Sequence, residues 1–344
     1  MKWGIIAILV VLLSGACAFG VWFAFFRPVA RFTAPRIVTI DRGDSFRTAA
    51  RKLERAGVVR SSIVLIIWAD FSGQARSVKP GDYEFAGGES IGAVLHHLVR
   101  GDYLVSIVTI PEGLTVRQIG ERLERAGLVC QSDFDFQARQ GPLIAALGLE
   151  PLGAEGYLFP ATYRFSPHAD AEAIVAQMLQ RFYALLTPTV EQRMFELHVD
   201  TRQLVTMASI VEKEARVPGE RALVASVFYN RLRLGMPLQS DPTAEYNPEG
   251  EDEPAVIAVH RSSQFNTYEF VGLPPGPIAN PGESSIMAAL YPAHTDYLYF
   301  VARGDGTHVF SRTLKEQERA IAALRKHEAQ PPAAAALPLE THAK

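Results

Sequence analysis

The chain has 344 residues, 48% of them hydrophobic, which is enough for a substantial core divided over two or three compact units. Its formal net charge is −3 and it has no strongly basic patch, which argues against a nucleic-acid-binding protein. The two cysteines, Cys17 and Cys130, show no metal-ligand or disulfide spacing, and no His/Cys/Asp grouping suggests a metal site. We therefore expect no metal or other cofactor.

Residues 1–27 are predicted to form a transmembrane anchor. No charged residue occurs from Trp3 to Phe26, and a helix needs about 20 apolar residues to cross the hydrocarbon core of a bilayer. This pattern predicts a single-pass protein of the cell inner (cytoplasmic) membrane. The alternative is a cleaved signal peptide, because Ala16-Cys17-Ala18 resembles a cleavage site, and the mature chain would then begin near Phe19.

Residues 28–36 are interpreted as a short linker that contains two prolines. Basic residues are more frequent after the apolar run than before it. The positive-inside rule, taken alone, therefore places the rest of the chain on the cytoplasmic side. The basic residues concerned are Lys2 before the run and Arg27, Arg31 and Arg36 after it.

Residues 37–142 contain an internal repeat, in which residues 38–59 align without gaps with residues 108–129. Each copy predicts a short β-branched strand, a glycine turn, an amphipathic helix and a glycine stop. Ser45 and Thr115 are expected at the N-cap or in the first helical turn. The matching Leu53 and Leu123 are expected to face the core. Two copies are too few for a solenoid, so we predict small α+β modules.

Between the two copies, residues 79–85 predict a turn followed by a strand, and residues 91–98 predict a helix that ends at Gly101. A larger α+β domain is predicted from residue 143 to residue 325. It is expected to contain helices over residues 171–197, 202–216 and 220–234, a loop-rich region, and a strand over residues 297–302. The tail, residues 326–344, is rich in alanine and proline and is predicted to be disordered.

The predicted helix over residues 202–216 carries two candidate acidic residues. Glu212 and Glu214 are two positions apart, so they point to different sides of a helix and cannot form a close carboxylate pair. Glu214 shares a stripe with Met207 and Ile210, and an apolar environment would raise the pKa of its carboxyl into the range of a general acid. The alternative, which helical periodicity alone favours, is that both glutamates are solvated.

Polar residues are concentrated near a proline-bounded loop that follows the helix predicted over residues 220–234. Such loops often carry ligand contacts, although aspartate and serine before proline are also ordinary turn residues. Farther on, a segment dense in proline and glycine suits the wall of a cleft. Tyr268, Tyr163 and Phe159 are candidates for stacking on sugar rings, or else core residues. His308 is a lone histidine beside a strand and is not expected to be a ligand.

Several of these segments, in this order, resemble the endolytic murein transglycosylase family, also called YceG-like proteins. Each fragment is weak alone, but their order over about 150 residues is highly specific. The fragments are Glu155-Gly-Tyr-Leu-Phe-Pro160, Ala208-Ser-Ile-Val-Glu-Lys-Glu214, Asn230-Arg-Leu232, Leu238-Gln-Ser-Asp-Pro-Thr243, Asn266-Thr-Tyr268, Gly272-Leu-Pro-Pro-Gly276, Pro281-Gly282 and Tyr297-Leu-Tyr-Phe300.

The resemblance implies an N-terminal membrane anchor, LysM-like α+β modules over residues 37–142 and an α+β catalytic domain that faces the periplasm or cell exterior. It implies that Glu214 is catalytic and that the partners are peptidoglycan glycan strands and peptidoglycan synthases. The expected substrate-binding residues are Glu212, Asn230, Gln239, Ser240, Asp241, Thr243, Asn266 and Tyr268.

Glu214 is the one carboxyl that the sequence supports as a catalytic group, whereas hydrolysing glycosidases normally use two. Lytic transglycosylation needs only one, because the C6 hydroxyl of N-acetylmuramic acid is the nucleophile. The expected reaction is endolytic cleavage of the bond between N-acetylmuramic acid and N-acetylglucosamine, which leaves 1,6-anhydro ends. Two alternatives stay open: a peptidoglycan hydrolase with Asp241 as second carboxylate, and a non-catalytic wall-binding scaffold.

Overall fold

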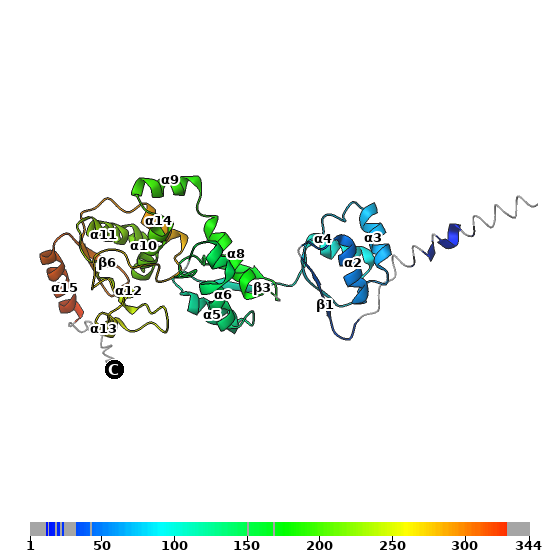
Figure 1. The fold of residues 1–344 in the computed structure, drawn as a ribbon, viewed down its shortest axis with the longest axis horizontal. Helices are drawn as coiled ribbons and strands as arrows, with labels where there is room; N and C mark the ends of the chain where they lie inside the picture. The colour runs from blue at the N-terminus through cyan, green and yellow to red at the C-terminus, as the bar shows by residue number, and fades with distance from the viewer. Residues whose placement is uncertain are drawn as a thin grey trace, which may run out of the picture. The chain divides into compact units, whose positions relative to one another are not determined.

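The computed structural model describes residues 12, 14–17, 19–20, 23, 32–41, 43–149, 151–167 and 169–328 (Figure 1). Among these residues, no helix combines the length and the apolar character that crossing a membrane requires. Most of the predicted anchor at residues 1–27 lies outside the described residues, as does the tail beyond Glu328, so both stay predictions. Of the predicted linker, residues 32–35 are irregular and Arg36 begins the first strand.

The fold is α+β, with three two-stranded sheets among the described residues. The chain divides into two compact units. The first contains the described residues up to Val108 together with Tyr163–Ala169, and the second contains Thr109–Thr162 and the chain from Asp170 onward. This division differs from the predicted boundary at residue 143, because most of the second copy of the repeat packs within the second unit.

In the first unit, strand β1 (Arg36–Ile40) pairs antiparallel with β2 (Gly81–Phe85). Three helices gather beside this sheet in Figure 1: α2 (Phe46–Arg55), α3 (Ser62–Phe71) and α4 (Ile91–Arg100). Residues from all five elements form one hydrophobic core. The strand predicted after a turn within residues 79–85 and the helix that ends at Gly101 are confirmed.

The second copy of the repeat builds the same local structure with β3 (Ser106–Ile110) and α5 (Val116–Arg125). Ser45 caps α2, and Thr115 caps α5 in a capping box with Gln118. Leu53 and Leu123 are fully buried. The glycines at the helix stops, Gly57 and Gly127, have φ angles of 68° and 70°, in the left-handed region that favours glycine.

The structural repeat extends beyond the aligned segments. Two helices, α6 (Gln131–Gln140) and α7 (Pro142–Ala146), lead from α5 to strand β4 (Ala161–Phe165), which forms a two-stranded sheet with β3. In each copy the returning strand carries a stacked Tyr-x-Phe pair, with ring centroids 6.3 Å apart in β2 and 5.2 Å apart in β4. Tyr163 and its equivalent Tyr83 are thus core residues.

The single helix predicted over residues 171–197 is instead two helices, α8 (Ala171–Tyr183) and α9 (Pro188–Leu197). Thr187 caps α9 and Pro188 occupies its first turn. Proline disfavours helical conformation in the residue before it, so the apolar periodicity continues across a segment where the backbone cannot stay helical.

The second unit is organised around α10 (Thr201–Glu214), in which every residue from Leu204 to Val211 is buried. It packs against α11 (Arg221–Arg233), α12 (Asp241–Glu245) and α14 (Glu283–Leu290). A short 3-10 helix, η1 (Pro218–Glu220), connects α10 to α11. Burial on all sides fixes the position of the last residue of α10, Glu214.

The rest of this part of the second unit consists of the short helix α13 (Ala255–Ala258), two paired strands and a final helix. Strand β5 (Tyr299–Ala302), which confirms part of the predicted strand over residues 297–302, pairs antiparallel with β6 (His308–Ser311). Helix α15 (Leu314–Glu328) packs against both strands and continues past residue 325, where the disordered tail was predicted to begin.

Candidate active site

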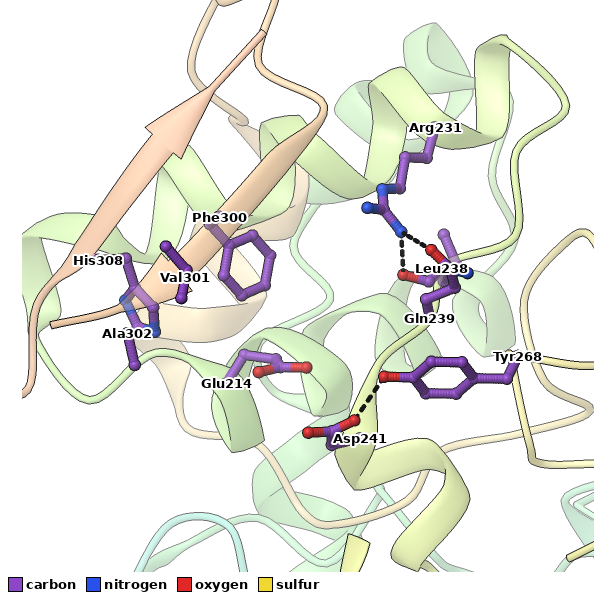
Figure 2. A pocket seen from close by; sticks show the side chains of 10 residues that line it. All are labelled: Glu214, Arg231, Leu238, Gln239, Asp241, Tyr268, Phe300, Val301, Ala302 and His308. Carbon is purple, nitrogen blue, oxygen red and sulfur yellow. Dashed lines mark hydrogen bonds between the residues drawn. The ribbon is translucent and has the colours of Figure 1, made fainter. Parts of the chain in front are cut away.

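A cavity of about 290 Å³ opens at the C-terminal end of α10 (Figure 2). One wall carries polar side chains from α11, from the loop before α12, from α12 and from the segment after α13. The other wall is the β5–β6 hairpin. The lining residues are Glu214, Arg231, Leu238, Gln239, Asp241, Tyr268, Phe300, Val301, Ala302 and His308.

Glu214 lies between these walls and is partly exposed to the cavity. Burial among surrounding protein atoms raises the pKa of its carboxyl to about 7, and the nearby charges of Asp241 and Glu245 act in the same direction. The C-terminal end of α10 carries negative partial charge, which also disfavours the ionised form. A carboxyl with this pKa can both give and accept a proton near neutral pH.

Ser240 orients this carboxyl. Its hydroxyl donates a hydrogen bond of 2.6 Å to Glu214 Oε1, an interaction that partly offsets the rise in pKa. In the part of the chain that the structure describes, Oε2 has no hydrogen-bond partner. One oxygen of Glu214 is therefore held, while the other is available to a substrate.

The loop that carries Ser240 is itself fixed by internal hydrogen bonds. The Ser240 backbone N–H donates to Thr267 Oγ1 over 3.1 Å, and the Gln239 N–H donates to the Thr267 carbonyl over 3.2 Å. Gln239 has a φ angle of 50°, in the left-handed region that non-glycine residues rarely adopt. Such strain is typical of functional sites held by their surroundings.

Arg231, which was not predicted as a site residue, holds the opposite side of the same loop. Its Nη1 donates to the carbonyl of Leu238 over 2.8 Å and to Gln239 Oε1 over 3.2 Å (Figure 2). Its Nε donates to the carbonyl of Leu298, just before β5, over 2.7 Å. One guanidinium thus connects both walls of the cavity, and its positive charge favours ionised Glu214.

Asp241 and Tyr268 form the outer part of the polar wall. The Tyr268 hydroxyl donates a 2.6 Å hydrogen bond to Asp241 Oδ1, and both residues are exposed. A second hollow, lined also by α13, lies on the other side of this pair. Tyr268 therefore presents an aromatic face where a sugar ring can stack.

Three further predicted site residues make internal contacts outside the cavity lining. Thr243 and Asn266 are fully buried, and Asn266 donates to the Val259 and Arg261 carbonyls. The Asn230 amide donates to two carbonyls in the segment before β5. The structure therefore places Thr243, Asn266 and Asn230 in supporting positions.

Glu212 is on another side of α10, as its spacing from Glu214 predicts. Its Oε2 accepts hydrogen bonds from the Gly282 N–H over 3.0 Å and from the Ser285 hydroxyl over 2.7 Å. Both donors are at the start of α14, and Arg221 lies 3.3 Å from Oε1. Glu212 thus joins the N-terminus of α14 to α10 rather than facing the cavity.

We compared the chain with known protein families and solved structures. The sequence model of the YceG-like family matches residues 38–323, which include every residue that lines the cavity. The chain belongs to the YceG-like family. A crystal structure of a yceG-like protein from Listeria monocytogenes superposes with a TM-score of 0.57 at 30% identity, covering 85% of this chain and 100% of that one.

Two relatives are named endolytic murein transglycosylase. The protein from Bacillus subtilis (strain 168) is 34% identical over 304 residues, which cover 82% of this chain and 83% of the relative. The protein from Streptococcus pneumoniae serotype 2 (strain D39 / NCTC 7466) is 29% identical over 321 residues. The match covers 83% of this chain and 57% of that relative's length.

Proposed function

We propose that this chain is an endolytic peptidoglycan lytic transglycosylase with Glu214 as its acid and base. The observation that carries this proposal is a single carboxyl with a pKa raised to about 7, at the centre of a cavity, with one oxygen held by Ser240. The names of the relatives from Bacillus subtilis and Streptococcus pneumoniae support the substrate class.

In the proposed reaction, protonated Glu214 first donates its proton to the glycosidic oxygen between N-acetylmuramic acid and N-acetylglucosamine. The bond to that oxygen breaks, and positive charge develops at the anomeric carbon of N-acetylmuramic acid. The carboxylate of Glu214 then removes the proton from the C6 hydroxyl of the same sugar as its oxygen attacks the anomeric carbon. The product is a 1,6-anhydro ring, no water is consumed, and Glu214 ends protonated as it began.

The polar wall supports this proposal. Gln239, Asp241 and Tyr268 line the cavity beside Glu214, and we infer that they bind the sugar whose anomeric carbon reacts. The Asp241 carboxylate can stabilise positive charge that develops there. The second carboxyl in the cavity also keeps the hydrolase alternative open, because Asp241 could activate a water molecule.

Mass spectrometry of the fragments that the full chain releases from purified peptidoglycan separates these reactions. We expect fragments with anhydro ends, each lighter by one water than the product of hydrolysis. A Glu214→Gln variant should release them about 10²–10⁴-fold more slowly. Fragments with reducing ends would establish a hydrolase and direct attention to Asp241. Binding without release by the parent chain would leave the wall-binding scaffold.

We also propose that residues 1–27 anchor the chain in the cytoplasmic membrane, with the second unit outside it, and that LysM-like modules over residues 37–142 bind glycan. The apolar run from Trp3 to Phe26 and the repeat support these two assignments. Association with peptidoglycan synthases is a further expectation. A native N-terminus near Phe19 would instead indicate a secreted, processed chain.

A further inference from the structure

The proposed reaction does not use one buried pair of side chains at the edge of the cavity, His308 and Glu220. The His308 ring Nδ1 lies 2.7 Å from Glu220 Oε2, and the His308 backbone N–H donates to Glu220 Oε1 over 3.1 Å. The side chains are 7% and 15% exposed. One carboxylate therefore holds both the backbone and the ring of His308.

This pair joins two parts of the second unit that are distant in sequence. Glu220 ends η1, six positions after Glu214, and His308 begins β6, 88 residues farther along the chain. The ring of Phe300 meets the imidazole edge to face, with centroids 5.3 Å apart. The imidazole is thus held by Glu220 and by Phe300. Because Glu220 is only six positions after Glu214, this contact also fixes where His308 lies relative to Glu214.

The contact with Glu220 also determines which ring nitrogen is free. A carboxylate can only accept a hydrogen bond, so Nδ1 carries the proton in this contact. Within the described part of the chain, Nε2 has no hydrogen-bond partner. Nε2 is therefore the ring nitrogen left to form a hydrogen bond with a ligand, and the ring that carries it lines the cavity.

The two walls of the cavity differ in chemistry. Figure 2 shows Arg231, Gln239, Asp241 and Tyr268 on one side of Glu214, and His308 with β5 on the other. Of the lining residues that β5 and β6 supply, His308 is the one with a polar side chain. A cut within a glycan strand requires sugars on both sides of the broken bond, so this wall also needs a group that recognises a sugar.

We propose that His308 is a substrate-binding residue for the sugar that occupies the β5–β6 side of the cleaved bond, and that Glu220 is its positioning residue. His308 Nε2 forms a hydrogen bond with a hydroxyl or the acetamido group of that N-acetylated sugar. This inference rests on the proposed function, since it assigns a second contact to the same glycan.

Two variants of His308 separate a contact through Nε2 from a merely structural pair with Glu220. Asparagine places a polar atom near the position of Nδ1 and can keep the bond to Glu220, whereas glutamine can reach the position of Nε2. For soluble, peptide-free glycan strands we expect His308→Asn to raise KM about five- to tenfold, as loss of one hydrogen bond does, with kcat little changed. His308→Gln should keep KM close to that of the parent chain.

Three further measurements complete the test. Glu220→Gln, which removes the fixed tautomer, should raise KM by a smaller factor than His308→Asn does. In a Glu214→Gln background, in which turnover is slow enough to measure binding, His308→Asn should weaken glycan binding by the same factor as it raises KM. His294→Gln, a change at an exposed histidine outside the cavity lining, is the matched control and should leave both quantities unchanged.

The outcomes distinguish this inference from the proposed function. If the parent chain releases no anhydro fragments, the proposed function fails and this inference fails with it. If the parent cleaves and His308→Asn, with an unchanged unfolding temperature, keeps the parental KM and binding, the inference alone is overturned. It is also overturned if asparagine preserves KM and glutamine does not, because the pair with Glu220 would then be purely structural.

Discussion

Two regions of the second unit each hold a carboxyl whose pKa burial raises to about 7, yet their surroundings differ. Glu214 faces a cavity and has one oxygen without a partner among the described residues. Glu155 is 2% exposed and both of its oxygens are occupied. A raised pKa alone therefore does not identify a catalytic group; access and an unoccupied oxygen do.

Glu155 connects elements that are far apart in sequence. It accepts hydrogen bonds from the Val116 N–H over 3.1 Å, from the Asn280 amide over 3.0 Å and from the Tyr246 hydroxyl over 3.2 Å. Val116 begins α5, in the second copy of the repeat, and Tyr246 follows α12, which begins beside Ser240. Glu155 therefore joins the second copy of the repeat to the structure that supports the cavity.

The largest expected effect is on the rate of cleavage. Glu214→Gln cannot donate a proton, so we expect the rate of release of anhydro-ended fragments to fall by about 10²–10⁴-fold, the usual contribution of a general acid and base. The same substitution at the enclosed carboxyl, Glu155→Gln, should lower the rate by far less. Equal losses in the two variants would contradict the distinction between these regions.

The opposite order is expected for stability. Glu155→Ala leaves the buried Val116 N–H and one of the two Asn280 amide hydrogens without an acceptor, which should lower the free energy of unfolding by about 3 kcal/mol. Glu214→Ala removes a poorly solvated carboxyl and breaks only its hydrogen bond with Ser240, so the free energy of unfolding should change by no more than about 1 kcal/mol. Urea unfolding of both variants, followed by circular dichroism, measures the difference.

The two carboxyls should also give different pH dependences. Both pKa values are raised in the folded state, so the stability that each contributes is complete below the unfolded pKa of about 4.3 and is lost as pH rises through about 7. Glu155→Gln should therefore reduce the loss of unfolding free energy between about pH 5 and pH 8 by roughly 2–3 kcal/mol. Urea unfolding at both pH values measures this change, and an unaltered pH dependence would contradict it.

The pH dependence of the cleavage rate should follow the titration of Glu214, not that of Glu155. Because protonated Glu214 donates the first proton, the rate should fall as pH rises above about 7. Glu155→Gln should leave this limb of the pH–rate profile in place. A profile of kcat from pH 5 to pH 9 for the parent and for Glu155→Gln tests the assignment.

The smallest effect is expected from Ser240→Ala. The Ser240 hydroxyl bond lowers the pKa of Glu214, so its removal should move the falling limb of the pH–rate profile to higher pH. The rate at its maximum should fall only a few-fold, since the carboxyl loses orientation but not its proton. Ser226→Ala, which changes a buried hydroxyl outside the cavity lining, is the matched control. A limb that stays at the parental pH would show that this bond does not influence the titration.

The local structure of the repeat was predictable, because caps, glycine stops and apolar spacing act over a few residues. Ser45, Thr115, Leu53 and Leu123 all occupy their predicted positions. The break between α8 and α9 was missed, although the signal, Thr187-Pro188, is visible in the sequence. Apolar periodicity continues across this segment, but the restriction that proline imposes on the residue before it ends the helix.

The cavity was predictable only in part. Glu214, Gln239, Asp241 and Tyr268 line it, and the resemblance to the family led to them. Arg231 stood within a quoted fragment, and its signal was a basic residue in the last turn of the helix that precedes the polar loop. The pair of Glu220 and His308 has no local signal at all, because its members are 88 residues apart and only the folded chain brings them together.

The division of the chain into two units affects how the protein can be dissected. The chain leaves the first unit after Val108, returns to it at Tyr163 and leaves again after Ala169. A fragment that ends near residue 108 therefore lacks Phe165 and the rest of the returning segment, and a fragment that starts at residue 143 lacks β3 and α5. The chain thus passes between the units three times, and one proteolytic cut in any of these passages leaves the other two intact. Variants with single substitutions leave all three passages intact, so they are the safer way to assign roles to each unit.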